Sequence, residues 1–352
     1  MIEIVHGISA LRKLEGEWTR LGAFFPTPLV QYDWILSCAE TLYPEEDLRV
    51  VLVRSGDRVT AIAPLVLVRK AVTRWLEIIG VSVLYEPCGL LYEDPHALQE
   101  LLDGVLHLGY PVLLARIPAA SPIPSAMRVQ KKARAVVLVR EAAGSCCVDI
   151  KSDWNTIFSS IRPNRRTDFR RTQRQAEAIG EVSVEIFCPA PDSLEPHLNE
   201  AIQIEAASWK GQAGSSLRDN ERLRAFFRNY AGKACRNGTL RICFYRVKGV
   251  AISMHIGVEY ARRLWIFKIG YDESWRKISP GMQLAHQTIR YACEKGLEGY
   301  EFLGSDEPWQ HEWPVRTHEY CSIVAFTPSL RGIMGMFDTL IAYTRNRLAA
   351  KG

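Results

Sequence analysis

The segment from Arg276 to Gly281 is well suited to binding a phosphate group. Ser279 can cap the helix that we predict to follow it, and Pro280 suits the first turn of that helix. A helix start presents free N–H groups and the positive end of its dipole, which both favour phosphate or pyrophosphate. Gly281 permits close approach to the backbone, and Arg276 and Lys277 add two cations. Such a Ser-Pro-Gly start is also common as a helix cap without a ligand.

Three ionisable residues are candidates for accepting a proton beside such a ligand. Asp306 follows a predicted strand in FLGSDEP, Glu205 lies in a predicted helix, and His255 lies within a predicted strand. Carboxylates and histidines act as general bases when they face the reacting group. The alternatives are a turn cap for Asp306, a surface helix position for Glu205 and a hydrogen-bonded core position for His255.

A run of arginines is the candidate site for an anionic substrate. Arg162, Arg166 and Arg170 are four residues apart, so they share one face of a helix. Arginine suits phosphate and carboxylate recognition because it donates two parallel hydrogen bonds. The alternative is a solvated helix face whose charges pair with acidic residues elsewhere. Trp209 and Trp309 are candidates for flanking the substrate, with simple packing as their alternative.

Other chemistries lack their motifs. No GxSxG elbow, no GxxxxGK(S/T) loop and no HExxH spacing around His311 and His318 is present. None of the nine cysteines forms a CxxC pair. We therefore predict no metal site, and we expect the cysteines to be reduced, mostly buried thiols of a cytoplasmic protein.

Composition indicates a folded protein of two domains. The chain has 352 residues, of which 47% are hydrophobic and 24% charged, with a net charge of +5. These values exclude a disordered chain and a collagen-like one. The mild positive charge permits an anionic ligand without requiring nucleic acid. No apolar run approaches the roughly 18 residues that a membrane span needs, and the charged N-terminus does not resemble a signal peptide.

The hydrophobic pattern places these candidates on a mixed array of elements. In the first half we expect helices over 9–22, 31–42 and 95–108, and strands over 48–54, 58–70, 76–80, 111–116 and 135–141. In the second half we expect helices over 153–178, 194–209, 220–233 and 279–295, and strands over 182–187, 239–247, 250–260, 263–272, 299–305 and 316–327. A last helix should pack through a stripe of Ile333, Met336, Phe337, Leu340 and Ile341. The less favoured alternative is a helix on a membrane surface, since its polar face is not especially basic. The common order of the two halves indicates two copies of one fold.

This order resembles the GCN5-related N-acetyltransferase (GNAT) superfamily. Arg276-x-x-Ser279-x-Gly281 is similar to its (Arg/Gln)-x-x-Gly-x-(Gly/Ala) loop, with Ser279 where glycine is usual. The resemblance implies that this loop binds the pyrophosphate of an acyl-CoA and that the preceding strand supplies a backbone N–H to the carbonyl oxygen. The residues implied to hold acetyl-CoA or another acyl-CoA are Phe267, Ile269, Gly270, Arg276, Lys277, Ser279, Pro280, Gly281, Met282 and Gln283.

A narrower resemblance rests on SIRPNRRTDFRRTQRQAEAIG, EAASWKG and ISPGMQLAHQTIRYACEKGLEGYEFLGSDEPWQHEW. These segments are similar to CelD/BcsL-like acetyltransferases, which are related to the Fem-type transferases with two GNAT-like domains. The family's usual Tyr-Lys is Trp309-Gln310 here. The resemblance implies an α/β (α+β) fold of tandem GNAT-like domains, with mixed, mostly antiparallel sheets flanked by helices. We expect a degenerate domain over 1–148, an acyltransferase domain over 149–328 and an amphipathic helix over 329–352.

We therefore predict an acyl-CoA-dependent acyltransferase acting on an amine or hydroxyl of a sugar-containing or other anionic acceptor, as in exopolysaccharide or cellulose synthesis. Asp306, Glu205 or His255 would serve as the base. One alternative is a Fem-like enzyme that takes an aminoacyl group from charged tRNA. Nucleic acid is the less favoured partner because aromatic residues do not interleave with the arginines. The other alternative is a non-catalytic scaffold in polysaccharide assembly.

Overall fold

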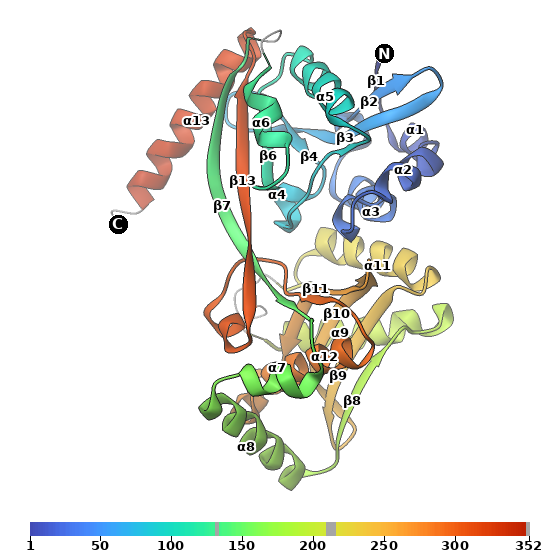
Figure 1. Ribbon diagram of the computed structural model, residues 1–352, viewed down its shortest axis with the longest axis vertical. Helices are drawn as coiled ribbons and strands as arrows, with labels where there is room; N and C mark the ends of the chain where they lie inside the picture. Colours follow the sequence, from blue (N-terminus) through green and yellow to red (C-terminus); the bar gives the residue numbers. More distant parts are fainter. Residues whose placement is uncertain (131–133, 209–215, 350–352) are drawn as a thin grey trace. The chain divides into compact units, whose positions relative to one another are not determined.

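The computed structural model describes residues 1–130, 134–208 and 216–349. The chain forms two compact units (Figure 1). Unit 1 comprises Met1–Ala143 together with Glu319–Gly352, and unit 2 comprises Gly144–His318. Each unit is a mixed sheet with helices, so the predicted fold class is confirmed.

Unit 1 has the strand order β1-β2-β3-β4-β6-β13, and the short β5 pairs with β3. All neighbours are antiparallel except β4 and β6, which are parallel because helix α5 crosses between them. The strands are β1 (Ile2–Val5), β2 (Leu48–Ser55), β3 (Arg58–Arg69), β4 (Arg74–Ile78), β5 (Leu91–Tyr92), β6 (Val112–Pro118) and β13 (Val315–Phe326). The helices are α1 (Ile8–Arg12), α2 (Glu15–Gly22), α3 (Tyr32–Leu42), α4 (Val81–Leu84), α5 (Pro95–His107), α6 (Ile123–Arg128) and α13 (Leu330–Ala349), with short 3-10 turns η1 (Pro28–Val30) and η2 (Glu45–Asp47).

Unit 2 has the strand order β7-β12-β11-β10-β9-β8. The strands are β7 (Val136–Asp149), β8 (Val182–Phe187), β9 (Leu240–Val247), β10 (Val250–Tyr260), β11 (Arg263–Tyr271) and β12 (Gly299–Glu301). The helices are α7 (Trp154–Ser160), α8 (Pro163–Ile179), α9 (Leu194–Ala206), α11 (Glu221–Arg236) and α12 (Pro280–Glu294), with 3-10 turns η3 (Pro191–Ser193), η4 (Glu273–Ile278) and η5 (Pro308–Glu312).

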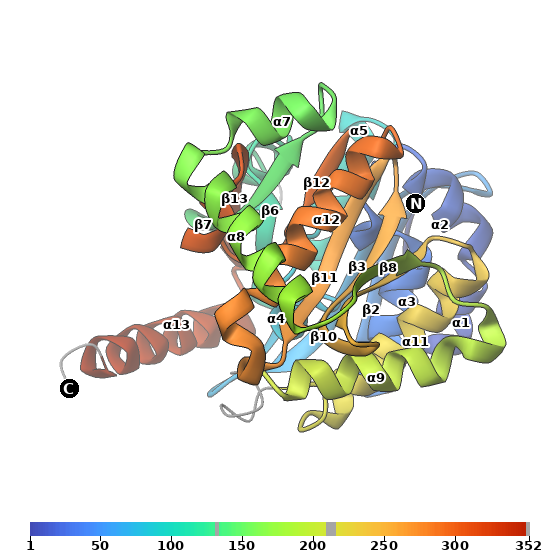
Figure 2. The same cartoon turned by 90° about the horizontal axis from the view of Figure 1, so that it is seen from below.

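The three consecutive strands predicted over 239–247, 250–260 and 263–272 are confirmed, and they form an antiparallel meander in unit 2. Both of its turns have two central residues with positive φ, namely Lys248 and Gly249 in one and Ala261 and Arg262 in the other. This conformation matches the right-handed twist of the strands and gives a tight hairpin. β11 and β12 are then parallel, with α12 as the crossover between them. Figure 2 shows α12 lying over β10 and β11.

The two units share one topology, and each takes its last strand from the other half of the chain. In both, four antiparallel strands are followed by a helical crossover to a parallel strand. β7 follows β6 in the chain, yet residues 147–149 of β7 pair with β12 of unit 2. Conversely, residues 320–325 of β13 pair with β6 of unit 1.

The predicted single helix over 153–178 is wrong, because the structure has two helices there. α7 ends at Ser160 and α8 begins at Pro163. Arg162 lies between them with φ −49 and ψ 136, outside the helical region. A proline ring disfavours helical backbone at the residue before it, so Pro163 forces the break.

The predicted packing stripe of the last helix is also wrong. Ile333, Met336, Phe337 and Leu340 are all exposed. α13 instead buries Gly332, Gly335 and Asp338 on its opposite side. The Asp338 carboxylate accepts hydrogen bonds from the N–H groups of Val72 and Thr73 and from the Trp75 indole. Among the described residues, none of the helices combines the length and the apolar character that a membrane span requires.

Candidate functional site

The predicted phosphate-binding segment forms a 3-10 turn that leads directly into helix α12. Arg276 and Lys277 lie in the last part of the turn with exposed side chains, and Pro280 is the first helical residue. Helix geometry leaves the first-turn N–H groups without partners within the helix. Gln283 N–H already bonds to the Ser279 carbonyl at 3.0 Å. Gly281 and Met282 therefore supply the remaining donors at the positive end of the α12 dipole.

Two backbone features shape this helix start. Ser279 has φ 50 and ψ 52, which is the left-handed region that glycine adopts without strain. This explains why glycine suits that position of the motif. A Cβ at Gly281 would lie 3.1 Å from the Tyr271 ring, so the glycine lets the end of β11 pack closely against α12.

The strand before this turn loses its parallel partner halfway along. The β11–β12 pairing covers only the residue pairs from Arg263 to Trp265, while β11 continues to Tyr271. Phe267, Ile269 and Gly270 thus lie on the part of β11 that is unpaired on its β12 side and that runs into the 3-10 turn. The structure brings these predicted donor-binding residues into one continuous strand–turn–helix segment.

Gln283 differs from its predicted neighbours because its side chain is occupied. Its amide donates to the Phe169 carbonyl at 2.8 Å and to the Thr172 hydroxyl at 2.6 Å. The side chain is buried and ties α12 to α8. Gln283 therefore fixes the direction of α12.

Glu205 and His255 lie on opposite faces of the unit 2 sheet. His255 is paired with Cys243, whose side chain packs with Leu284 of α12. Directly opposed residues share a face, so His255 lies on the α12 side. Glu205 lies on the α9 side, where a Cβ at Gly270 would come within 2.7 Å of its Cα atom.

Neither residue is a surface group. Glu205 is fully buried, and its Oε2 atom accepts a hydrogen bond from Leu217 N–H at 2.7 Å. That bond holds the chain after α9 against the helix. His255 is also buried, within the central strand. The structure therefore does not bring the three predicted bases together.

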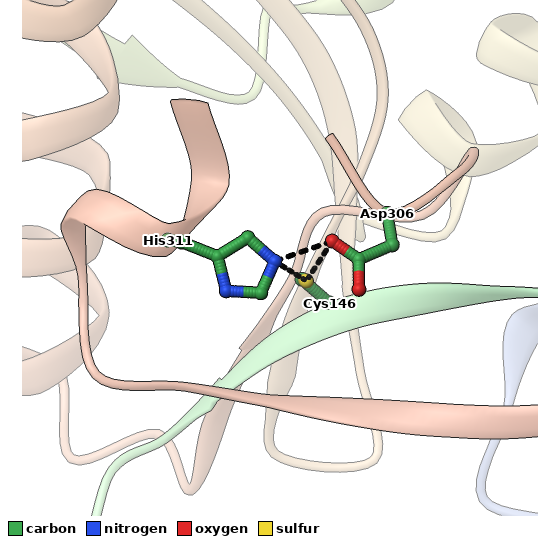
Figure 3. A group of neighbouring side chains, drawn as sticks. All are labelled: Cys146, Asp306 and His311. Carbon is green, nitrogen blue, oxygen red and sulfur yellow. Dashed lines mark hydrogen bonds and ion pairs between the residues drawn. The ribbon is translucent and has the colours of Figure 1, made fainter. Parts of the chain in front are cut away.

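Asp306 lies in a cluster that contains two residues absent from the sequence prediction. Figure 3 shows Cys146, Asp306 and His311 pointing toward one another. His311 Nε2 is 2.5 Å from Asp306 Oδ1, and Cys146 Sγ is 3.4 Å from the same oxygen. Cys146 Sγ is 3.9 Å from His311 Nε2. The Thr317 hydroxyl donates to Asp306 Oδ2 at 3.3 Å.

The elements around the cluster hold its backbone in place. Phe302 N–H donates to the Cys146 carbonyl, and Asp306 N–H donates to the Gly144 carbonyl. β7 is thus bonded to the segment after β12 at Gly144 and at Cys146. A capping box between Glu307 and Gln310 begins the turn that carries His311.

Electrostatics within the cluster favour a neutral thiol beside a charged carboxylate. Hydrogen bonding to His311 lowers the pKa of Asp306. Burial, followed by the hydrogen bond to Asp306, raises the pKa of the Cys146 thiol to about 11. A thiol in this state is a weak nucleophile.

A second cluster lies on the other face of β7, because Cys147 points opposite to Cys146. It contains Cys147, Glu301 and His318. Here the Glu301 carboxylate already forms an ion pair with an arginine. Arg263 Nε donates to Glu301 at 2.6 Å, and His318 Nε2 lies 3.0 Å from the same carboxylate. This cluster is a closed ion-pair network.

The predicted run of three arginines on one helix is wrong for Arg162, which precedes α8 in non-helical backbone because Pro163 follows it. The predicted acceptor residues are also partly engaged with acidic and aromatic groups. Arg162 Nη2 is 2.7 Å from the Glu312 carboxylate, and Arg170 lies over the Phe158 ring. The Arg166 side chain is half-buried. Trp309 packs in an aromatic cluster with Phe302 and Trp313. Trp209 lies outside the described residues.

Comparisons with known proteins bear on the fold that carries these residues. Residues 163–311, less than half of the chain, match the family described as an acetyltransferase (GNAT) domain. The structure of FemX has a TM-score of 0.63 at 12% identity, over 95% of this chain and 99% of that one. The structure of L-PGS from Bacillus licheniformis has a TM-score of 0.57 at 15% identity, over 96% and 99%.

A third structure is the C-terminal domain of a putative lysylphosphatidylglycerol synthetase from Agrobacterium fabrum. Its TM-score is 0.57 at 8% identity, over 94% of this chain and 97% of that one. No curated protein matches the sequence. The protein thus has the fold of GNAT-type acyltransferases. The strand–turn–helix segment of β11 and α12 lies inside the matched region.

Proposed function

We propose that the protein transfers an acyl group, acetyl in the simplest case, from acyl-CoA to an amine or hydroxyl of a sugar-containing or other anionic acceptor. The observation that carries this proposal is the start of α12. Its free N–H groups, its dipole and the exposed Arg276 and Lys277 converge where β11 ends. These features together suit the pyrophosphate of coenzyme A.

Transfer from a thioester needs a donor to the carbonyl oxygen, a base for the acceptor and a leaving thiolate. In this proposal a backbone N–H between Phe267 and Gly270 faces the carbonyl oxygen. The base removes a proton from the acceptor while its nitrogen or oxygen attacks the acyl carbon. Asp306 is the favoured base because its side chain is 35% exposed, while Glu205 and His255 are buried.

The acceptor side rests on Arg162, which precedes α8, and on the half-buried Arg166 and the exposed Arg170 of this helix, with Trp309 as a candidate for flanking the acceptor. We propose that Arg162, Arg166 and Arg170 attract an anionic acceptor such as a saccharide of the exopolysaccharide or cellulose pathways. Release of Arg162 from Glu312 would free its guanidinium for a bidentate contact. Residues 1–148 would be a degenerate copy of the catalytic domain.

Isothermal titration with acetyl-CoA tests the proposal. Replacing both cations, Arg276→Ala with Lys277→Ala, should weaken binding about tenfold or more, because a hydrogen bond to a charged group contributes about 1.5–3 kcal/mol. Arg290→Ala is the matched control. It removes an exposed arginine about 15 Å further along the same helix, where it forms an ion pair with Glu294. Absence of acetyl-CoA binding at millimolar ligand would refute the proposal.

The exposed arginines of α8 also favour a second candidate, a Fem-like transferase that uses charged tRNA. Such an enzyme would bind tRNA with an affinity that falls steeply with salt, because each phosphate contact releases counterions. Tight, salt-dependent binding of tRNA together with no response to acetyl-CoA would select this candidate. A scaffold without catalysis would keep its function in Asp306→Ala with Glu205→Ala.

A further inference from the structure

We propose that Cys146, Asp306 and His311 form a binding site for a zinc ion. The three side chains each direct one ligand atom to a common point, as Figure 3 shows. A thiolate, an imidazole nitrogen and a carboxylate oxygen are ligands that zinc accepts. The thiolate selects against magnesium and calcium, which prefer oxygen alone.

The distances fit a metal better than they fit a nucleophile with its base. A catalytic triad uses the two nitrogens of histidine for different partners. Here a single atom, His311 Nε2, faces both Asp306 Oδ1 at 2.5 Å and Cys146 Sγ at 3.9 Å. The same carboxylate oxygen also contacts the thiol at 3.4 Å. All three contacts therefore close one triangle, as around a shared ion.

Only a small adjustment would seat the ion. Zinc bond lengths of about 2.0–2.3 Å place tetrahedral ligands of these kinds about 3.3–3.6 Å apart. The Sγ–Oδ1 distance of 3.4 Å and the Sγ–Nε2 distance of 3.9 Å are close to that range. The Nε2–Oδ1 distance must open by somewhat less than 1 Å. His311 can move this far because its side chain is 51% exposed on the η5 turn.

Charge distinguishes this cluster from its neighbour on the other face of β7. Among the described residues, no lysine or arginine contacts Asp306, whose hydrogen bonds come from His311, Cys146 and Thr317. In the second cluster Arg263 pairs with Glu301 and supplies the positive charge that a metal would bring. The Asp306 carboxylate thus has no Lys or Arg partner among the described residues, whereas Glu301, on the other face of β7, already pairs with Arg263.

The charges and protons of the three ligands can be accounted for when Zn²⁺ binds. Cys146 loses its thiol proton to solvent, Asp306 binds as the carboxylate and His311 binds as the neutral ring. Two negative ligands then neutralise Zn²⁺, and water fills the fourth position. The Thr317 hydroxyl remains bonded to the second oxygen of Asp306 and orients this ligand.

This inference does not depend on the proposed acyl transfer. With zinc bound, Asp306 is a ligand and cannot accept a proton, so the two roles of Asp306 belong to different states of the protein. Failure of the metal experiment would leave acetyl-CoA binding untouched, and failure of acetyl-CoA binding would leave the metal site untouched.

The test is titration of the full-length, metal-stripped protein with Co²⁺ and Zn²⁺. We expect one equivalent of Co²⁺ to produce a thiolate-to-cobalt charge-transfer band that Zn²⁺ abolishes. Cys146→Ser should remove the band, while Cys147→Ser, the adjacent cysteine on the opposite face, should keep it. Thr317→Val should weaken zinc binding about 10–100-fold, as expected for loss of a hydrogen bond to a ligand.

Thermal unfolding provides a readout that does not need the spectrum. Zinc, but not magnesium, should raise the unfolding temperature of the wild type and of His318→Gln, and leave that of His311→Gln unchanged. Circular dichroism without metal verifies that each variant is folded. A wild type without a cobalt–thiolate band, or a band that persists in Cys146→Ser, would overturn the proposal.

Discussion

Ser279 adopts a backbone conformation that favours glycine, although it carries a side chain. Its left-handed conformation is needed to turn the chain from η4 into α12, yet its side chain makes no cap hydrogen bond. Left-handed backbone costs a residue with a Cβ about 1–2 kcal/mol relative to glycine. The serine therefore adds strain at the proposed donor site without a compensating bond in the cap.

Ser279→Gly should consequently stabilise the protein by about 1 kcal/mol, because glycine adopts this conformation without strain. Urea unfolding of the variant and the wild type measures the difference. Gly296→Ser is a reciprocal control, since Gly296 has φ 68 with open space around it and should lose stability by a similar amount. Destabilisation by Ser279→Gly would show that the serine makes a contribution that its geometry does not reveal.

His286 gives unit 2 a dependence on pH. Its ring stacks on Phe169 and contacts Trp154 and Phe158 edge-on, at ring distances of 4.6, 4.8 and 5.2 Å. Burial among these rings, with a smaller effect of Arg290, lowers the pKa of His286 to about 4. The unfolded ring protonates near its ordinary pKa of about 6.5. The resulting stability is complete above about pH 6.5 and is lost as the pH falls toward 4.

We therefore expect His286→Phe to remove part of the acid sensitivity of unfolding. The wild type should lose about 3 kcal/mol from this histidine between pH 7 and pH 4, while the variant should not. Urea titrations of both proteins at several pH values in this range give the comparison. Parallel curves for the two proteins would mean that the histidine ring titrates equally in both states.

At the scale of elements, one close contact sets how α9 lies against the sheet. Gly270 on β11 lies against the backbone of Glu205 in α9. A Cβ atom added at residue 270 would be 2.7 Å from the Cα atom of Glu205. The helix can therefore approach this strand only because residue 270 has no side chain. The same contact positions the buried Glu205, which holds Leu217.

Gly270→Ala should force α9 and β11 apart and destabilise the protein by about 1–3 kcal/mol, as overpacking does. Gly232→Ala in α11 is the control, because its added Cβ would meet nothing closer than 3.7 Å. Replacing a helical glycine by alanine should leave stability equal or increase it by up to about 1 kcal/mol. Equal stabilities of the two variants, measured by urea unfolding, would contradict the tight contact.

The sequence predicted those strands and helix starts that are determined by residues close together in the chain. The hydrophobic pattern predicted the three strands on either side of the turns at Lys248-Gly249 and Ala261-Arg262, and Ser279-Pro280 located the start of α12. The break at Pro163 was missed because the helical periodicity continues across it. The exposed stripe of α13 was misjudged because Asp338, a polar residue, provides the anchoring contacts.

The Cys146 cluster had no local signal at all. Cys146 precedes Asp306 by 160 residues, and pairing of β7 with β12 brings them together. Motif searches for metal ligands examine short spacings, so they cannot find ligands that a distant strand supplies. Only the topology of unit 2 reveals that this cysteine faces the loop after β12.

At the scale of the whole molecule, the exchange of β7 and β13 makes each unit depend on both halves of the chain. A fragment of residues 1–148 lacks the β13 residues that complete unit 1, and a fragment of residues 149–352 lacks most of β7. We expect neither fragment alone to unfold cooperatively. Expression of the two together should restore near-ultraviolet circular dichroism and protease resistance. A stable fragment of either kind would contradict this dependence.

The exchange also determines the order of events during synthesis. Strand β6 leaves the ribosome early, but residues 320–325 that cover its edge are translated about two hundred positions later. Until then the nascent N-terminal half exposes an unsatisfied row of backbone groups, which is prone to intermolecular pairing. Pairing across such long sequence separations is intrinsically slow. Yield in cells should therefore depend on chaperones that shield nascent chains, more than the stability of the finished protein would suggest.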